Sequence, residues 1–218
     1  MFDEDYSKAG DLATLLNEGL QKLGVSASNH QSEKLLALLE TLYKWNKAYN
    51  LTAIKQPKEG LQLHILDSLT LVSRFGKLEN NQTILDVGTG PGFPGLPLAI
   101  LFPHLKFTLL DSNSKKIRFI RQTIHQLDIQ NVEPIHSRVE SIVDRKFNVI
   151  TSRAFASIND MLKLTVNLIA EGGVWLAMKG DFSEVEISSL PEYIASQTIT
   201  PIKIPGLNAQ RCVVELSK

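Results

Sequence analysis

The chain has little of the chemistry that stabilises secreted proteins or anchors proteins in membranes. It contains one cysteine, Cys212, in 218 residues, which excludes an internal disulfide framework and any multi-cysteine metal or iron–sulfur site. Its histidines show no metal-ligand spacing. No apolar run approaches the ~18 residues that a membrane span needs, and residues 1–6 are acidic, unlike the basic start of a secretory signal. We therefore predict a cytoplasmic protein that holds no metal and does not enter a membrane.

An excess of charge of one sign is also missing, since 23 basic residues balance 23 acidic residues. The middle of the chain is the basic part: residues 83–153 contain 9 Lys and Arg against 6 Asp and Glu. This excess of positive charge is a weak hint of a polyanionic partner, because a net charge does not say where the charges point.

The first 80 residues are predicted to be mainly helical. Apolar residues, most of them leucines, recur at helical spacing over residues 11–23, 32–45 and 57–72. Gly24 is a natural end for the first of these helices, and Pro57 is a natural start for the third. A chain of 218 residues is long enough for one α/β domain with an appendage but not for two full domains. We therefore assign residues 1–80 to a helical N-terminal extension.

From residue 81 onward, short apolar runs alternate with helical stretches. The runs predict strands over residues 83–87, 107–111, 132–135, 147–151 and 173–178, with helices between them over residues 93–101, 114–127 and 158–169. Strands separated by helices indicate βαβ crossovers and a mainly parallel sheet. Residues 198–204 and 211–216 are predicted to add an antiparallel hairpin. We therefore predict a doubly wound α/β domain over residues 81–218 with a seven-stranded, mainly parallel sheet.

A glycine-rich loop follows the first predicted strand directly and opens a helix. Its sequence runs from Gly88 through Gly90 and Gly92 to Gly95, and Gly90-x-Gly92-x-x-Gly95 matches the dinucleotide fingerprint. Asp111 falls 19 residues after Gly92, close to the ~20 expected of a ribose-binding acid. On this match alone, a Rossmann-type NAD(P) oxidoreductase is a fair interpretation, and a loop that merely connects strand to helix is a second one.

Asp86, at the tip of the first strand, favours a different cofactor. Its carboxylate would face the pyrophosphate of a dinucleotide, and like charges about 4 Å apart repel by about 4 kcal/mol even at an effective dielectric near 20. S-adenosylmethionine has no phosphate and carries a sulfonium and an ammonium, so the same carboxylate becomes favourable, directly or through water. Asp111 at the end of the second strand is then expected to accept hydrogen bonds from the ribose hydroxyls, with a role as a helix N-cap as the alternative.

Other candidate residues follow from their position at predicted strand ends. Val139 and Glu140, after the third strand, stand where such folds place the adenine edge. Arg153, after the fourth strand, is expected to bind the methionine carboxylate or the target nucleotide, with a surface ion pair as the alternative. Lys179 and Arg211 are candidate phosphate contacts.

Two helical patterns leave their alternatives open. Lys115, Arg118 and Arg121 share one side of a predicted helix and are interpreted equally well as an RNA-phosphate patch or as a solvated face. His64 and Asp67 stand at i and i+3 and can hydrogen bond to each other, which more often indicates a structural role.

Several motifs together resemble the ribosomal RNA small subunit methyltransferase G family. The resemblance extends from the second predicted helix to Arg211. Its motifs are Leu85–Leu98 around the glycine loop, His64-x-x-Asp67-Ser68-Leu69, Lys115–Phe119, Ser152-Arg153-Ala154-Phe155 and Met178-Lys179-Gly180. One departure is Gln210-Arg211-Cys212, where the family usually has Glu-Arg-His, so any role of that histidine is in doubt here.

The resemblance implies a reaction and a set of cofactor contacts. It implies N7-methylation of one guanine in bacterial 16S rRNA, at the position usually numbered 527, with S-adenosylmethionine as methyl donor. The substrate would be 16S rRNA within the 30S subunit or a precursor particle. Gly88 and Phe93 match loop positions that bind the cofactor in the family, Val139 and Glu140 match the adenine-side pair, and Arg153 matches the arginine of the Ser-Arg-Ala-Phe motif.

The chemistry of this reaction agrees with what the sequence lacks. Guanine N7 is a neutral in-plane lone pair that can attack the sulfonium methyl without losing a proton, so positioning is sufficient and no catalytic acid or base is assigned. Cys212 lies in a tail strand and not in a motif that would make it the nucleophile for pyrimidine C5 methylation. The fourth strand is not followed by the Asn/Asp-Pro-Pro-aromatic loop that grips an exocyclic amine. An adenosyl-binding module without catalysis remains a further alternative.

Overall fold

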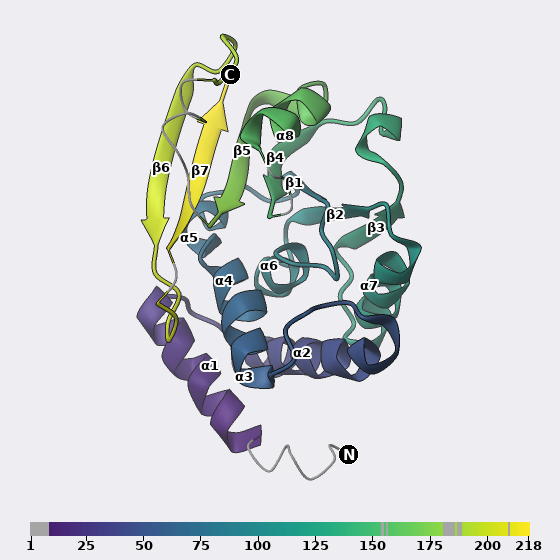
Figure 1. Ribbon diagram of the computed structural model, residues 1–218, viewed down its shortest axis with the longest axis vertical. Coiled ribbons are helices and arrows are strands. Elements are labelled where there is room, and N and C mark those ends of the chain that lie inside the picture. Colours follow the sequence, from purple (N-terminus) through teal and green to yellow (C-terminus); the bar gives the residue numbers. More distant parts are fainter. Residues whose placement is uncertain (1–8, 154, 156, 181–185, 187–188, 209) are drawn as a thin grey trace.

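A central sheet of seven strands organises the computed structural model, which describes residues 9–153, 155, 157–180, 186, 189–208 and 210–218 (Figure 1). The strand order is β3-β2-β1-β4-β5-β7-β6. The strands are β1 (Thr83–Val87), β2 (Lys106–Asp111), β3 (Val132–His136), β4 (Phe147–Ser152), β5 (Ile169–Lys179), β6 (Ser196–Ile202) and β7 (Arg211–Ser217). The predicted seven-stranded α/β fold is confirmed.

The pairing of the strands puts a topological switch point at β1. Strands β1 to β5 run parallel, with β2 and β4 on either side of β1, while β7 pairs antiparallel with both β5 and β6. The chain therefore winds outward in both directions from β1 and β4. In open α/β sheets, ligands bind outside the carboxyl ends of the strands at such a point.

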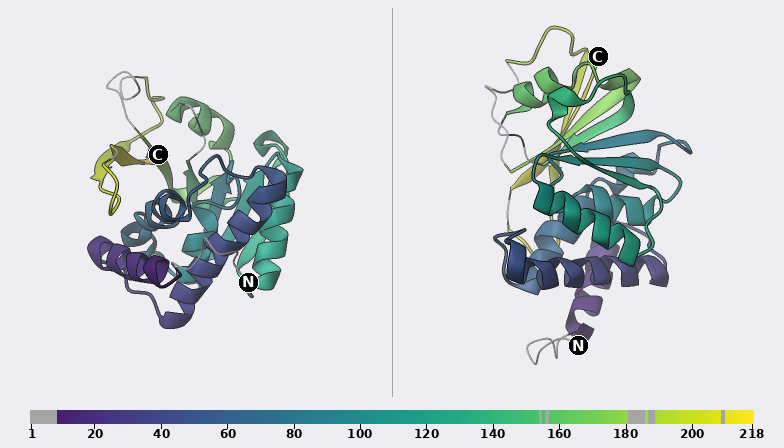
Figure 2. Two further views of the ribbon diagram at one scale, coloured as in Figure 1. Left: turned by 60° about the horizontal axis from the view of Figure 1, so that its bottom comes forward. Right: turned by 90° about the vertical axis from the view of Figure 1, so that its right-hand side faces the viewer.

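Helices cover both faces of the sheet (Figure 2). The helices between the strands are α6 (Gly95–Leu101), α7 (Ser114–Gln126), the 3₁₀ turn η3 (Val139–Ser141) and α8 (Ile158–Thr165). The prediction of a helix to residue 169 is wrong at its end, because α8 ends at Thr165 and Ile169 already belongs to β5. The apolar run there continues across the boundary, so its periodicity does not mark the change.

The N-terminal region is helical, as predicted, but its third helix is interrupted. The described elements are α1 (Ala9–Leu23), α2 (Asn29–Tyr49), α3 (Pro57–Gly60), the π-helix η2 (Leu61–Leu66), α4 (Asp67–Leu69) and α5 (Val72–Phe75). A capping box between Ser28 and Gln31 starts α2 three residues before the predicted start. The π-helix interrupts the predicted helix over residues 57–72, and π-helical turns are frequent at functional sites.

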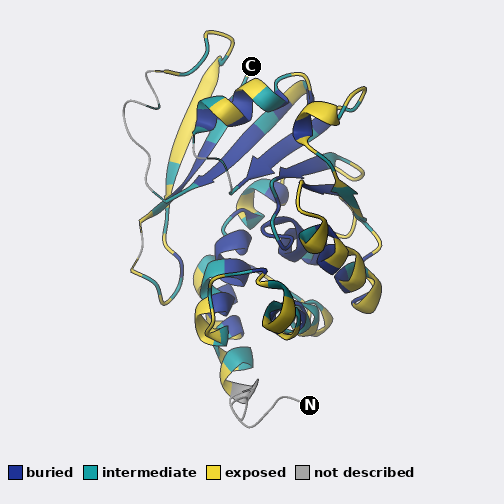
Figure 3. Cartoon of the chain, turned by 45° about the vertical axis from the view of Figure 1, so that its right-hand side comes forward, coloured by how far each residue is buried: buried dark blue, intermediate teal, exposed yellow. Residues whose placement is uncertain are grey.

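Two apolar cores lie on opposite faces of the sheet. One joins the N-terminal helices to α6, α7 and one side of the strands, and the other lies between α8 and the opposite side. Figure 3 shows the inner strands buried and β6, at the sheet edge, largely exposed. Because the first core contains residues from both predicted units, 1–80 and 81–218, the division of the chain at residue 80 stays a prediction. Among the described helices, none is long and apolar enough to cross a membrane.

Candidate functional site

The glycine loop lies at the switch point and leaves space beside its backbone. Gly90 has a φ of 62°, in the left-handed region, and a Cβ atom built on it would meet nothing within 4 Å. Gly95, where α6 begins, is different, because a Cβ atom there would lie 2.1 Å from Cδ2 of Leu109 and 2.9 Å from Oδ2 of Asp86. Glycine thus opens the loop to a ligand at one end and permits close packing of helix on strand at the other.

Asp86 lies at the bottom of this loop and is fully buried. Its Oδ2 accepts hydrogen bonds from the Thr89 hydroxyl at 2.6 Å and from the Gly95 amide at 2.9 Å. Its Oδ1 is buried and has no hydrogen-bond partner among the described residues. Burial, only partly offset by these two hydrogen bonds, raises the pKa of Asp86 to about 6. The site therefore contains a carboxylate oxygen that lacks a donor, as expected where a cationic ligand or a bound water completes the contacts.

Asp111 fastens the loop from the neighbouring strand. Its Oδ2 accepts a hydrogen bond from the Gly90 amide at 2.9 Å, and its Oδ1 accepts one from the Asn113 amide at 2.8 Å. Lys116 Nζ lies 3.8 Å from Oδ2. The alternative assignment of Asp111 as a helix N-cap is wrong, because Asn113 caps α7 by accepting from the Lys115 amide. Asp111 remains placed to receive further donors at the carboxyl edge of β2.

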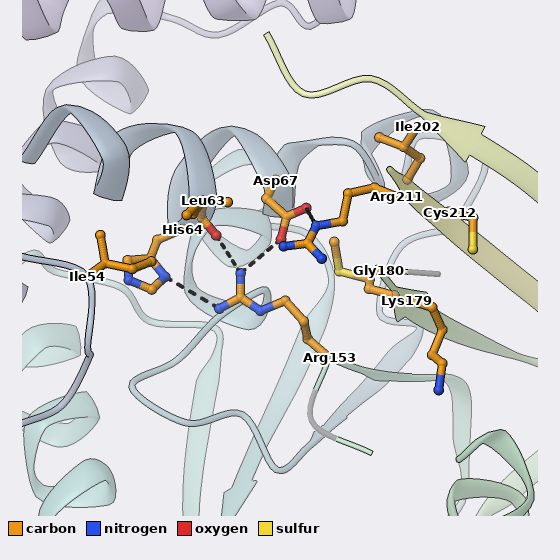
Figure 4. Close-up of a pocket in the computed structure, with 11 residues that line it drawn as sticks. Ile54, Leu63, His64, Asp67, Arg153, Lys179, Gly180, Ile202, Arg211 and Cys212 are labelled. Carbon is orange, nitrogen blue, oxygen red and sulfur yellow. Dashed lines mark hydrogen bonds and ion pairs between the residues drawn. The ribbon is translucent and has the colours of Figure 1, made fainter. Parts of the chain in front are cut away.

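Arg153 is held by η2 and the first residue of α4 rather than left in solvent (Figure 4). Its Nη1 donates to the carbonyl oxygen of Leu63 at 2.7 Å and to Oδ2 of Asp67 at 3.0 Å. Its Nη2 lies 3.5 Å from Nδ1 of His64, and its guanidinium lies 5.9 Å from the ring centroid of Phe93. The alternative of a surface ion pair does not describe this contact, since the Asp67 side chain is only 3% exposed. The N-terminal region thus fixes the cation at the end of β4.

His64 completes this arrangement. Its Nε2 is 2.9 Å from the Thr52 hydroxyl, and its ring stacks on Phe93 with 4.8 Å between centroids. Burial, and to a lesser degree the charge of Arg153, lower the pKa of His64 to about 3, so the ring is neutral at physiological pH. His64 and Asp67 therefore both contact Arg153, instead of forming the predicted contact with each other.

A hollow of about 250 Å³ opens beside Arg153, and we call it the target hollow. Its lining includes Asp67, Lys179 and Arg211. Lys179 is the last residue of β5, and Arg211 is the first residue of β7. The Nε atom of Arg211 lies 3.9 Å from Oδ1 of Asp67, too far for a hydrogen bond, and it is a buried donor without a partner among the described residues. Lys179 Nζ is already paired with Glu186 at 3.1 Å. Arg211 therefore brings a cation to the wall of the hollow, and its buried Nε donor is left without a hydrogen bond among the described residues.

The remaining predicted residues lie on η3 and α7. Val139 is buried and Glu140 exposed on η3, and the Ser137 amide just before it donates to the carbonyl oxygen of Asp111 at 3.2 Å. The cations of α7, Lys115, Arg118 and Arg121, are exposed on its outer face.

Sequence reasoning missed two contacts of the site. Thr52 lies in an irregular segment without a motif, and Leu63 contributes only its backbone carbonyl. No signal in the sequence identifies either contact. No cluster of metal-ligating side chains occurs among the described residues.

Comparison with known proteins shows the family to which the sequence is similar. The family model described as rRNA small subunit methyltransferase G matches residues 31–214. The ribosomal RNA small subunit methyltransferase G of Idiomarina loihiensis is 46% identical over 200 residues, which cover 91% of this chain and 95% of the relative. The same-named protein of Photobacterium profundum is 45% identical over 194 residues, covering 88% and 92%.

Solved structures of lower identity show the same fold. TrmN from Thermus thermophilus has a TM-score of 0.59 at 15% identity and covers 79% of this chain and 53% of its own. TYW2 from M. jannaschii, solved in complex with AdoMet, has a TM-score of 0.54 at 17% identity and covers 69% of this chain and 74% of its own.

Proposed function

The chain belongs to the rRNA small subunit methyltransferase G family, and on this premise we propose that it transfers the methyl group of S-adenosylmethionine to N7 of one guanine in 16S rRNA. The target guanine is the one usually numbered 527. The substrate is the RNA within the 30S subunit or a precursor particle.

The buried oxygen of Asp86 is the observation that carries the choice of cofactor. An ammonium or sulfonium group supplies the positive charge that this oxygen lacks, whereas a pyrophosphate at the same place is repelled by Asp86 and Asp111 together. The residues therefore fit S-adenosylmethionine, which when bound supplies a methyl group on a positively charged sulfur. The same observation disfavours a Rossmann-type NAD(P) oxidoreductase.

The other cofactor contacts follow from the arrangement around the loop. Gly88 and Gly90 give the ligand access to the backbone, and Phe93, beneath His64, supports the loop from inside. Asp111 accepts hydrogen bonds from the ribose hydroxyls. Val139 and Glu140 on η3 border the adenine.

The target side of the site positions the base and needs no proton acceptor. The imidazole of His64 and the carboxylate of Asp67 are both engaged with Arg153, so neither is free to remove a proton from a substrate. This favours a nucleophile such as guanine N7, which attacks the methyl with its own lone pair. Arg153 is then a positioning residue at the boundary of cofactor and target, and Arg211 and Lys179 contact acceptors or phosphates of the target nucleotide. The rate comes from alignment and desolvation.

Replacing Asp111 by alanine is expected to weaken S-adenosylmethionine binding by about 1–3 kcal/mol, because charged hydrogen bonds to the ribose are lost. The dissociation constant is measured by calorimetry, and the midpoint of urea unfolding serves as a control for the fold. Unchanged affinity would show that Asp111 only fastens the Gly90 amide and does not hold the ribose.

The experiment that tests the whole proposal uses 30S subunits from a strain that lacks the enzyme. They are incubated with the protein and methyl-labelled S-adenosylmethionine, and the RNA is then cleaved with borohydride and aniline, which is selective for N7-methylguanosine. We expect one cleavage at the predicted guanine. Cofactor binding without incorporation would instead support an adenosyl-binding module without catalysis, and incorporation without cleavage would move the reaction to another atom.

A further inference from the structure

A second hollow, of about 700 Å³, lies along the end of β6 and the loop that joins it to β7. We call it the hairpin groove. Gly180, Ile202, Arg211 and Cys212 line both this groove and the target hollow, so the two adjoin at the carboxyl edge of the sheet. Figure 4 shows Gly180 and Arg211 near Asp67, with Ile202 and Cys212 beyond Arg211. A ligand that is larger than the target hollow can therefore extend into the hairpin groove.

The lining of the groove suits a nucleic-acid strand. Its described lining residues include the cations Lys203 and Arg211 and no acid. Asn208 and Gln210 are exposed and carry amide groups, which can both donate to and accept from a base edge. Ile199 is 38% exposed, one of the largest exposures of an apolar side chain in the described residues. Two cations together with apolar and amide groups fit a phosphate that carries a splayed base.

The groove is fixed to the same elements that hold Arg153. Ile204, in the loop, is 2% exposed and belongs to the core that contains the N-terminal helices. Gly206 has a φ of 80°, and a Cβ atom on it would lie 2.3 Å from Nε2 of Gln62 in the π-helix η2. The loop therefore packs closely against η2, and the groove is formed before any substrate arrives.

We propose that the hairpin groove binds the single-stranded nucleotide next to the target guanine. A phosphate of this nucleotide contacts Lys203, and its base lies against Ile199 with its edge toward Asn208. The proposal rests on the proposed function, since it assumes that the guanine occupies the adjoining target hollow. It makes the β6–β7 hairpin a reader of the sequence or shape around the target.

A charge-removing variant with a matched control tests the phosphate contact. Lys203→Gln is compared with Lys163→Gln, which removes an exposed lysine on α8, outside both hollows. We expect Lys203→Gln to raise KM for 30S subunits by about fivefold to tenfold and to lower the slope of log K against log salt by about 0.7, the value for one phosphate of a single strand. Affinity for S-adenosylmethionine should be unchanged in both variants. Wild-type KM and slope in Lys203→Gln would overturn the proposal.

Crosslinking identifies the occupant. A photoreactive p-benzoyl-phenylalanine at position 208 is irradiated in complex with 30S subunits, and reverse transcription locates the crosslink. We expect a stop within a few nucleotides of the target guanine. A crosslink to a ribosomal protein, or to distant rRNA, would show that the groove holds another partner. Because wild-type methylation is measured in the same preparations, failure of this proposal is distinguishable from failure of the proposed function.

Discussion

Arg153→Ala is expected to lower kcat for methyl transfer at least about 100-fold and to lower the free energy of unfolding by about 3 kcal/mol. The loss of activity follows from the position of Arg153 at the switch point, between the cofactor loop and the target hollow. The loss of stability follows because Asp67, which is 3% exposed, loses its closest cation. Breaking a buried ion pair costs about 3–5 kcal/mol, and Arg211, 3.9 Å from the same carboxylate, keeps the cost at the lower end.

Two further variants separate activity from stability. Arg153→Lys keeps a positive charge for Asp67 but loses the planar fork that reaches Leu63 and His64 together, so it should remain folded and still lose most of its activity. Lys163→Ala, which removes an exposed lysine on α8, is the control and should change neither quantity by much. Single-turnover methylation and urea unfolding are measured on all variants. Wild-type turnover in Arg153→Lys would show that Arg153 has only a structural role.

The affinity for S-adenosylmethionine is expected to fall about tenfold between pH 7 and pH 5. The pKa of Asp86 in the free protein is about 6, so its carboxyl is ionised at pH 7 and protonated at pH 5. A cationic ligand favours the ionised form, and binding at pH 5 must therefore release a proton. Linkage then makes the affinity constant drop about tenfold for each pH unit below 6 and stay flat above it.

Asp86→Asn provides the matched test, because it keeps the shape of the side chain and removes its titration. Calorimetry at pH 5, 6 and 7 should show weak binding with no dependence on pH in this variant. Its unfolding free energy at pH 7 should be no lower than that of the wild-type protein, because burial opposes the charge in the folded state. Equal affinity of the wild-type protein at pH 5 and pH 7 would show that Asp86 does not sense the ligand's charge.

The fold could be predicted from the sequence because its signals are local. Strands buried on both faces appear as short apolar runs, and their alternation with helices leaves few topologies. The end of α8 could not be predicted, because the apolar run continues from the helix through residues 166–168 into β5. The π-helix was missed since its hydrogen bonds leave no mark in the apolar spacing.

The candidate site could be predicted where its residues stand at strand ends. Asp86, Asp111 and Arg153 all lie at the carboxyl edge of the sheet, as their positions after predicted strands indicated. Their partners could not be predicted, because Arg153 and Asp67 are 86 positions apart and meet only in the folded chain. The pairing of Lys179 with Glu186 could not be predicted either. The two residues are seven positions apart, and Lys179 is the last residue of β5, so no helical periodicity connects them.

The geometry of the π-helix η2 depends on the exact number of residues between positions 61 and 66. A π-helical turn is an α-helical turn that has gained one residue, and each residue of an α-helix turns the following side chains by about 100°. Removal of one residue from η2 would restore ordinary helical geometry and rotate the Leu63 carbonyl, His64 and Asp67 relative to one another. Exposed loops readily accept insertions and deletions during evolution. In this stretch we expect selection against them, even where they leave its apolar residues intact.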